Sequence, residues 1–386
     1  MLLDNKQVAI VGGGPGGLTL AKLLQLKGCH VKVYERDLDK NARVQGAPLD
    51  LHDESGLAAL TKAGLLDAFK NNFLPGADRE KIMNEQAEVF YSDHEIKPGS
   101  NFGHAHFRPE IDRGTLRKIL LNSLEPGTVM WNSHFIGMKP RNTGWQLEFK
   151  DGNIVEADVV IAADGAHSKI RPYITDSKAF YSGITMLDGT IENARQNVPV
   201  IYAMLNGGKI MAFGNEKNIL MGQKGNGEIG FYLSFKADPD WVVKSGLAFW
   251  DRTQVFNWFK KEYAGWSSVW DALLNHTILP FIPRPIYCIP LDQTWNALPN
   301  LTMLGDAAHV MPPFAGEGVN MAMLDALELS QTVTSDKFSS LQEAISYYEI
   351  HMRKRAAVMA KESLDNGERM HSKEALTTML GFFNSY

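Results

Sequence analysis

The first 35 residues constrain the fold most strongly, because they read as a strand, a glycine turn, a helix and a second strand. Residues 7–11 are a short apolar run typical of buried parallel strands, and Gly12-x-Gly14-x-x-Gly17 follows directly, with Pro15 inside the turn. In such a turn the first glycine permits the bend, the second lets the backbone approach a pyrophosphate, and the third lets helix and sheet pack closely. The helix N-terminus adds N–H groups and a partial positive charge. The pattern therefore predicts a βαβ unit that binds a dinucleotide.

Glu35 ends the predicted second strand, where a carboxylate can accept hydrogen bonds from the ribose hydroxyls of an adenosine. The same carboxylate would repel a 2′-phosphate, so NADP is disfavoured in this site. Strand, helix, strand and terminal acid together predict a dinucleotide site. They leave open whether the ligand is NAD or FAD.

Charge and cysteine content exclude several classes of protein. The 386 residues carry a net charge of −5, whereas a nucleic-acid-binding protein usually has a basic surplus. Cys29 and Cys288 stand far apart and outside any metal-binding spacing, which predicts reduced thiols and no metal site, although a disulfide between them stays open. The sequence has no signal-peptide pattern and no apolar run of about 18 residues. We therefore expect a cytoplasmic protein that contacts neither nucleic acid nor membrane.

The remaining patterns predict an antiparallel sheet inserted into the nucleotide-binding domain. Further parts of that domain are expected at 112–124 (helix), 159–163 and 301–304 (strands) and 318–334 (helix). Glycine and asparagine turns separate β-rich runs at 200–205, 209–213, 218–221 and 228–235. A long helical pattern at 340–370 follows.

Two further motifs identify a family. Residues 164–171 begin with Asp164-Gly165, and residues 305–320 begin with Gly305-Asp306 and contain Gly316 and Gly318. With the N-terminal glycine motif, they resemble the three motifs of the group A flavoprotein monooxygenases, the para-hydroxybenzoate hydroxylase type. The resemblance implies bound FAD, transient NADPH or NADH, and O2. It also implies hydroxylation of an electron-rich phenol or enol carbon through a flavin C4a-hydroperoxide, by a protein that is a monomer.

The resemblance also implies a set of cofactor-binding residues. Asp306 is placed to bind a polyol such as the ribityl chain, and a helix beginning near Gly318 would point its positive end at the flavin ring. Asp164 can serve the same site or form a simple turn, and His167 and His309 are expected to be structural. The expected cofactor residues are Gly12, Gly14, Pro15, Gly17, Glu35, Arg36, Asp50, Arg113, Asp164, Asp306, Pro313, Gly316, Gly318, Val319 and Asn320.

Within this family the chain is most similar to the tetracycline-inactivating flavin monooxygenases. The likeness includes residues 49–52, 116–125 and 305–320, but the inserted sheet departs from it. There Asp, Lys and Gly replace Gln, Arg and His, so a planar bidentate fork and a hydrogen-bonding ring are lost. The expected substrate residues are Asp188, Lys209, Met221 and Gly230 in the sheet, with Pro313, Phe314, Asn366 and Met370 elsewhere.

These inferences give an α/β fold with a Rossmann-like FAD-binding domain, an inserted antiparallel-sheet substrate domain and a C-terminal bridging helix. We expect the FAD-binding domain at 1–74, 101–183 and 279–335, the substrate domain at 75–100 and 184–278, and the C-terminal helix at 336–386. No catalytic side chain is required, because the flavin supplies the chemistry. The favoured substrate is a tetracycline-type antibiotic. The alternatives are another phenolic or polyketide compound, a flavin-containing drug-binding protein without activity, and an NAD-dependent dehydrogenase.

Overall fold

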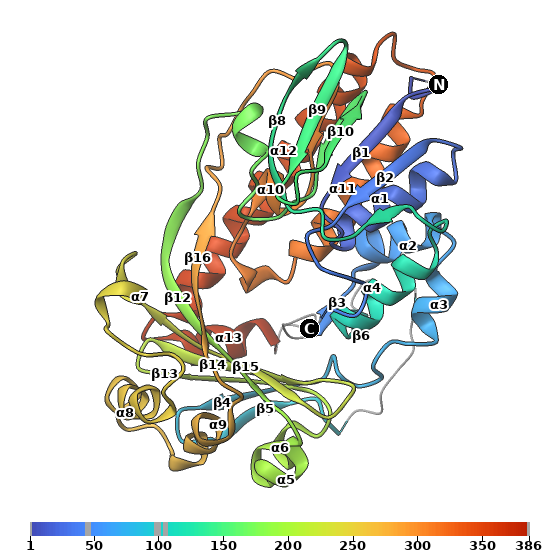
Figure 1. The fold of residues 1–386 in the computed structure, drawn as a ribbon. Helices are drawn as coiled ribbons and strands as arrows, with labels where there is room; N and C mark the ends of the chain where they lie inside the picture. Colours follow the sequence, from blue (N-terminus) through green and yellow to red (C-terminus); the bar gives the residue numbers. More distant parts are fainter. Residues whose placement is uncertain (1, 43–47, 96–101, 103–106, 384–386) are drawn as a thin grey trace.

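A computed structural model describes residues 2–42, 48–95, 102 and 107–383. Its first layer is a five-stranded parallel sheet in the order β17-β11-β1-β2-β7, at the upper right of Figure 1. The strands are β1 (Gln7–Val11), β2 (His30–Tyr34), β7 (Val129–Met130), β11 (Val159–Ala162) and β17 (Leu301–Met303). The predicted βαβ unit and the later strands of the nucleotide-binding domain are thus confirmed.

Helices cover this sheet because its central strands β1 and β11 are apolar on both faces, as parallel strands usually are. Ile10 and Val33 are fully buried, and α1 packs along α11. The three long helices predicted from apolar periodicity, α4, α11 and α12, are present. The helices of this part of the molecule are α1 (Pro15–Gln25), α2 (Ala58–Lys62), α3 (Leu66–Lys70), α4 (Arg113–Asn122), α10 (Asp306–His309), α11 (Gly318–Val333) and α12 (Leu341–Met370).

The second layer is a seven-stranded, mainly antiparallel sheet in the order β16-β12-β15-β14-β13-β4-β5, in the lower half of Figure 1. Its long strands β12 and β16 lead back to the parallel sheet. The strands are β4 (Glu80–Asn84), β5 (Val89–Ser92), β12 (Phe180–Ile191), β13 (Lys209–Gly214), β14 (Lys217–Gln223), β15 (Ile229–Lys236) and β16 (Ile282–Cys288).

The two faces of this sheet pack against different partners. One face forms a core with the helices drawn below the sheet in Figure 1. The opposite face packs against Phe314 and the C-terminal segment and is called the inner face here. The helices below the sheet are α5 (Ala194–Asn197), α6 (Pro199–Leu205), α8 (Arg252–Glu262) and α9 (Asp271–His276), and α7 (Trp241–Lys244) is drawn at the left of the sheet.

One predicted strand is wrong, because residues 200–205 lie in the helix α6. Pro199 starts this helix, where its missing N–H costs nothing and its fixed φ suits the first turn. Ile201 and Leu205, four residues apart, are both fully buried in the core below the sheet. The β-branched residues suggested a strand, but burial at helical spacing decides the structure.

Smaller elements complete the fold. A three-stranded sheet consists of β8 (Phe135–Arg141), β9 (Gly144–Phe149) and β10 (Ile154–Ala157), and β3 (Leu49–Asp50) pairs with β6 (Glu110–Ile111). After α12, the helix α13 (Ala375–Phe383) packs on β13, β4 and β5. Single helical turns are η1 (Asp53–Leu57), η2 (Arg171–Tyr173), η3 (Ser268–Trp270) and η4 (Pro313–Ala315). Among the described residues, no helix is both long and apolar enough to span a bilayer, and no metal-ligating cluster is found.

Candidate active site

The glycine turn between β1 and α1 has the shape that a pyrophosphate requires. Gly12 has φ +114°, and a Cβ on Gly12 would lie 2.1 Å from the carbonyl oxygen of Ala163. A Cβ on Gly17 would lie 2.1 Å from the carbonyl oxygen of Gly12, so both positions exclude a side chain. At Gly14, by contrast, a Cβ would meet no atom within 4 Å. The open space thus lies at the N-cap of α1, where helix N–H groups face an anion.

Glu35 lies beside this turn. Its carboxylate accepts hydrogen bonds from the backbone N–H groups of Gly13, at 2.6 Å, and Asp37, at 3.0 Å. Each carboxylate oxygen keeps a second lone pair for a ribose hydroxyl. Arg36, the neighbouring predicted residue, is exposed.

The Asp164 and Asp306 segments meet at one pocket of about 230 Å³, which is lined by Ala166, Ser168, Arg171 and Asp306 among others. Asp306 is exposed there. Asp164 accepts a hydrogen bond from the N–H of Lys169, while its Oδ1 atom is buried without a partner among the described residues. Asp164 and Asp306 are 142 residues apart in sequence, and their segments come together in space, as a shared ligand site requires.

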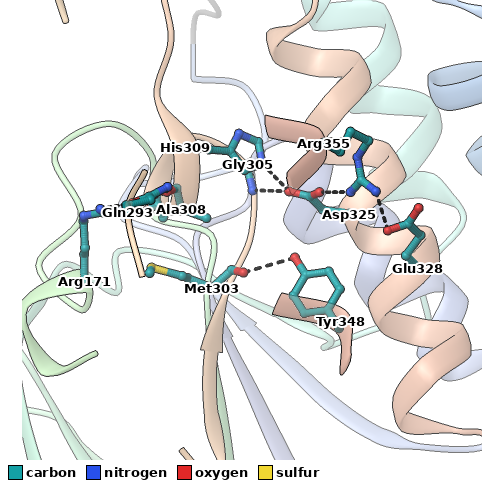
Figure 2. A network of polar contacts seen from close by, with 11 residues as sticks. Arg171, Gln293, Met303, Gly305, Ala308, His309, Asp325, Glu328, Tyr348 and Arg355 are labelled. Atoms are coloured by element: carbon teal, nitrogen blue, oxygen red, sulfur yellow. Dashed lines mark hydrogen bonds and ion pairs between the residues drawn. The ribbon is translucent and has the colours of Figure 1, made fainter. Parts of the chain in front are cut away.

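A buried network fixes the turn that presents Asp306 (Figure 2). Asp325 of α11 is fully buried and accepts hydrogen bonds from the N–H of Gly305, from His309 Nε2 and from Arg355 of α12, at 2.9, 2.5 and 2.6 Å. Burial lowers the pKa of His309, but the Asp325 carboxylate outweighs burial and raises that pKa above its ordinary value. His309 thus lies inside the protein as the partner of Asp325. His167, in contrast, is exposed.

The loop before α11 is held from the β3 side. A Cβ on Gly316 would lie 3.2 Å from an Asp50 carboxylate oxygen. Asn320, fully buried, donates to the carbonyl oxygens of Asp50 and Gly316 and accepts from the N–H of His52. His52 contacts the carboxylates of Asp50 and Glu317 at 3.1 and 3.2 Å. Burial lowers the pKa of His52, but these two hydrogen bonds outweigh it and raise the pKa to about 9.

The predicted residues of η4 and α12 are brought together. Asn366 donates to the carbonyl oxygen of Phe314, and Ser363 donates to that of Pro312. Phe314 also lines a small pocket with Ile184 and Gly367. Met370 is buried in the cluster that Phe314 packs against on the inner face. Val319 is half-buried at the start of α11, and Gly318 is its first residue.

Strand pairing shows which predicted sheet residues share a face. Lys209 pairs with Gly222, which pairs with Gly230, and paired residues point to the same side of a sheet. Asp188 pairs with Tyr232, two residues from Gly230, so it shares this side. This side is the inner face. Phe213 is four residues from Lys209 in β13, so the two side chains point to the same side, and Phe213 packs with Ile82 on the inner face.

Met221 does not lie on the inner face, in contrast to its prediction as a substrate residue. It is buried in the core between the sheet and the helices below it, on the face opposite Asp188, Lys209 and Gly230. Its neighbour Leu220 points to the inner face and packs near Phe314 and Met370. The side-chain period of a strand is two residues, so an error of one residue in the sequence comparison moves a side chain to the other face.

Lys209 is held by carboxylates from two layers. Its ammonium group lies 2.5 Å from Glu110 of β6 and 3.5 Å from Glu80 of β4. Burial, together with the nearby charges of Asp50 and Glu80, raises the pKa of Glu110 to about 7 despite the opposing charge of Lys209. Asp50 and Glu110 are directly paired in β3 and β6, so this cluster connects the sheet to the loop at Gly316.

Two charged residues of this region were not anticipated. Arg284 of β16 forms an ion pair with Asp188, and Glu110 binds Lys209. Glu110 stands three residues before Arg113 in the segment that matches the family, a signal that could have placed it near the cofactor. No sequence motif pointed to Arg284. Arg113 is exposed at the start of α4, and its charge lowers the pKa values of Asp188 and Asp306, although burial raises both overall.

The chain matches a known family over most of its length. The model of the FAD binding domain matches residues 5–180 and 299–359, which include every motif described above. The chain belongs to this family. The unmatched interval, 181–298, contains most of the seven-stranded sheet.

Named relatives agree with this family. A monooxygenase, asqM, of Emericella nidulans is 28% identical over 379 residues, covering 84% of this chain and 83% of the relative. The crystal structure of HpxO from Klebsiella pneumoniae with FAD and uric acid has a TM-score of 0.76 at 21% identity, covering 99% of this chain and 93% of that one. The tetracycline destructase Tet(51) has a TM-score of 0.72 at 19% identity, covering 97% and 94%. The two structures establish the shared fold.

This family member is therefore an FAD-dependent monooxygenase of the group A type. Its residues fit the cofactor, because the space at Gly14 suits a pyrophosphate, and the exposed Asp306 and the buried Oδ1 of Asp164 supply acceptors for hydroxyl groups. FAD is its bound cofactor.

Proposed function

We propose that this monooxygenase hydroxylates an electron-rich carbon of a phenolic or enolic compound, with a tetracycline-type antibiotic as the favoured substrate. The observation that carries the proposal is the position of the inner face opposite the Gly316 loop. Lys209 contacts Glu110, Glu110 pairs with Asp50, and Asn320 joins Asp50 to Gly316. A flat compound held between this face and the loop would lie beside the expected flavin ring.

Each part of the site has a separate task in this proposal. The N-terminus of α1 at Gly14 holds the pyrophosphate, Glu35 binds the adenosine ribose, and Asp306 binds the ribityl chain. The helix α11 is sixteen residues long, and its N-terminus directs the positive end of the helix dipole toward the flavin ring. This charge favours the reduced form of the flavin. When bound, the reduced cofactor together with O2 supplies the oxygen atom that is transferred.

The protein contributes position and the exclusion of water. Phe314 offers an apolar surface next to Ile184, and its backbone is fixed by Asn366 while its ring packs against His371 at 5.6 Å between centroids. This arrangement fixes the substrate side of the loop from α12. We also propose that the division into a discontinuous FAD-binding domain, a substrate domain and a C-terminal helix reflects these tasks.

Tetracycline is favoured because the likeness to the drug-inactivating enzymes covers nearly the whole chain, and the fold is that of a tetracycline destructase. Against it stand the changed residues of the sheet, Asp188, Lys209 and Gly230, which read the polar edge of the drug differently. Another phenolic or polyketide compound is therefore the second candidate.

Oxidation of NADPH by the purified protein tests the proposal, with and without tetracycline and with a panel of phenols and polyketides. We expect one compound to accelerate oxidation and to gain the mass of one oxygen atom. If oxidation accelerates without any oxygenated product across the panel, the proposed substrate class is wrong. If tetracycline is recovered unchanged while a phenol is oxygenated, the drug is not the substrate.

A further inference from the structure

Lys209 and Arg284 are two cations on the inner face of the sheet that are neutralised to different degrees. Lys209 contacts two carboxylates, Glu110 at 2.5 Å and Glu80 at 3.5 Å, and the charge of Asp50 acts on it as well. Its single ammonium group is thus already engaged by three carboxyl groups. An anion approaching Lys209 would meet the repulsion of these carboxylates.

Arg284 has a different environment. Its Nε and one terminal nitrogen both contact the same oxygen of Asp188, at 2.8 and 2.7 Å. A guanidinium group has five N–H donors in a rigid fork, and this contact uses two of them. The Arg284 side chain is 40% exposed, whereas that of Asp188 is 8% exposed. The carboxylate therefore fixes one edge of the guanidinium group and leaves the rest accessible.

Strand pairing places Arg284 close to the Phe314 loop. Arg284 of β16 pairs with Met186 of β12, so both point to the inner face with Asp188. Ile184 lies two residues farther along β12, about 7 Å at the rise of a strand, and lines the pocket that includes Phe314. The accessible part of Arg284 is thus near the surface where the proposed function places the substrate ring.

We propose that Arg284, oriented by Asp188, is a specificity-determining residue that binds an anionic oxygen of the substrate. The oxygen is a carboxylate, phenolate or enolate oxygen, since these match the planar donors of a guanidinium group. The inference rests on the proposed function for the position of the substrate. It adds that the preferred substrate carries a negative charge, and that Arg284, not Lys209, recognises it.

Binding to the FAD-loaded enzyme tests this inference with pairs of probes that differ in charge. The probes are 4-hydroxybenzoate, salicylate and 3-hydroxybenzoate, each compared with its methyl ester, and the dissociation constants come from changes in flavin absorbance. We expect at least one acid to bind more tightly than its ester. In Arg284→Met, the affinity for that acid should fall about ten- to a hundredfold, the effect of losing a charged hydrogen bond, while the ester is unaffected. Arg284→Lys should retain part of the preference.

Two controls separate recognition from a general effect. Lys236→Met removes a cation from β15, at the position paired with Ile184 and 45% exposed, and should leave the acid preference unchanged. Arg284→Met leaves Asp188 without its partner, so the double variant Asp188→Asn/Arg284→Gln provides a neutral pair in case the single variant folds poorly. It should also lose the preference.

The inference is overturned if no acid binds better than its ester, or if the preference survives in both Arg284→Met and the double variant. Loss of the preference in Lys236→Met as well would also overturn it. Failure of the proposed function is a separate result, because it would appear as the absence of an oxygenated product. Binding of the probes does not require turnover.

Discussion

Replacement of Asp325 by Asn should destabilise the protein and weaken FAD binding through the turn at Gly305. Asp325 is fully buried between His309 and Arg355, two cations that depend on its charge. Asn keeps one acceptor oxygen for the N–H of Gly305 but provides no counter-charge. Removing one partner from a buried ion pair costs about 3–5 kcal/mol. Because His309 can lose its proton in the variant, we expect a loss of unfolding free energy near the lower value, about 3 kcal/mol.

The effect of this substitution should depend on pH. The pKa of Asp325 is lowered in the folded protein, so its contribution to stability is present above about pH 4 and is lost in acid. The pKa of folded His309 is raised, so its contribution is complete below about pH 6.5 and falls as the pH rises through the folded pKa. The difference between wild type and Asp325→Asn should therefore be larger at pH 6 than at pH 8.5.

Urea denaturation of the FAD-free protein at both pH values measures these differences, and fluorescence titration gives the FAD dissociation constant, which should rise about tenfold if Asp306 is displaced. Glu328→Gln is the matched control. Glu328 bonds the same Arg355 but is 34% exposed, so its loss should cost about 1 kcal/mol or less and leave FAD binding unchanged. Equal stability losses in the two variants, or unchanged FAD affinity in Asp325→Asn, would refute the reasoning.

Three further predictions follow from other parts of the site. Gly14→Val should fold normally, because its side chain enters open space, but it should lose FAD when purified; retention of stoichiometric flavin would contradict the pyrophosphate site. Wild-type stability should fall as pH rises from about 6.5 to about 9, through the folded pKa of His52, and His52→Asn should lose much of this dependence in urea denaturation. Met221→Ala should lower the free energy of unfolding by about 2–5 kcal/mol without changing KM, whereas Leu220→Ala should raise KM. The reverse pattern would show that Met221, not Leu220, faces the substrate.

The sequence was sufficient for features that depend on local geometry. The glycine turn could be recognised because a Cβ on Gly12 or Gly17 would lie 2.1 Å from a backbone oxygen, so only glycine fits at either position. The helices α4, α11 and α12 follow from periodic apolar residues buried on one side. The α6 segment was misread, because its β-branched residues have strand propensity and only the surrounding core makes a helix favourable.

Features that depend on pairing between distant segments could not be predicted from the sequence. The face of Met221 is set by the register of β14 against β15, and no local signal distinguishes it from Leu220. Arg284 and Asp188 are 96 residues apart and meet only because β12 and β16 pair. The Asp325 network likewise joins α11, α12 and the Gly305 turn, whose ion pairs carry no spacing pattern in the sequence.

The most direct test of the account is a crystal structure of the protein with bound FAD. The account predicts the pyrophosphate at Gly14, the ribityl chain at Asp306, and the ring between the Gly316–Gly318 loop and the inner face that carries Asp188 and Arg284. A flavin that avoids Asp306, or whose ring lies away from the inner face, would contradict it.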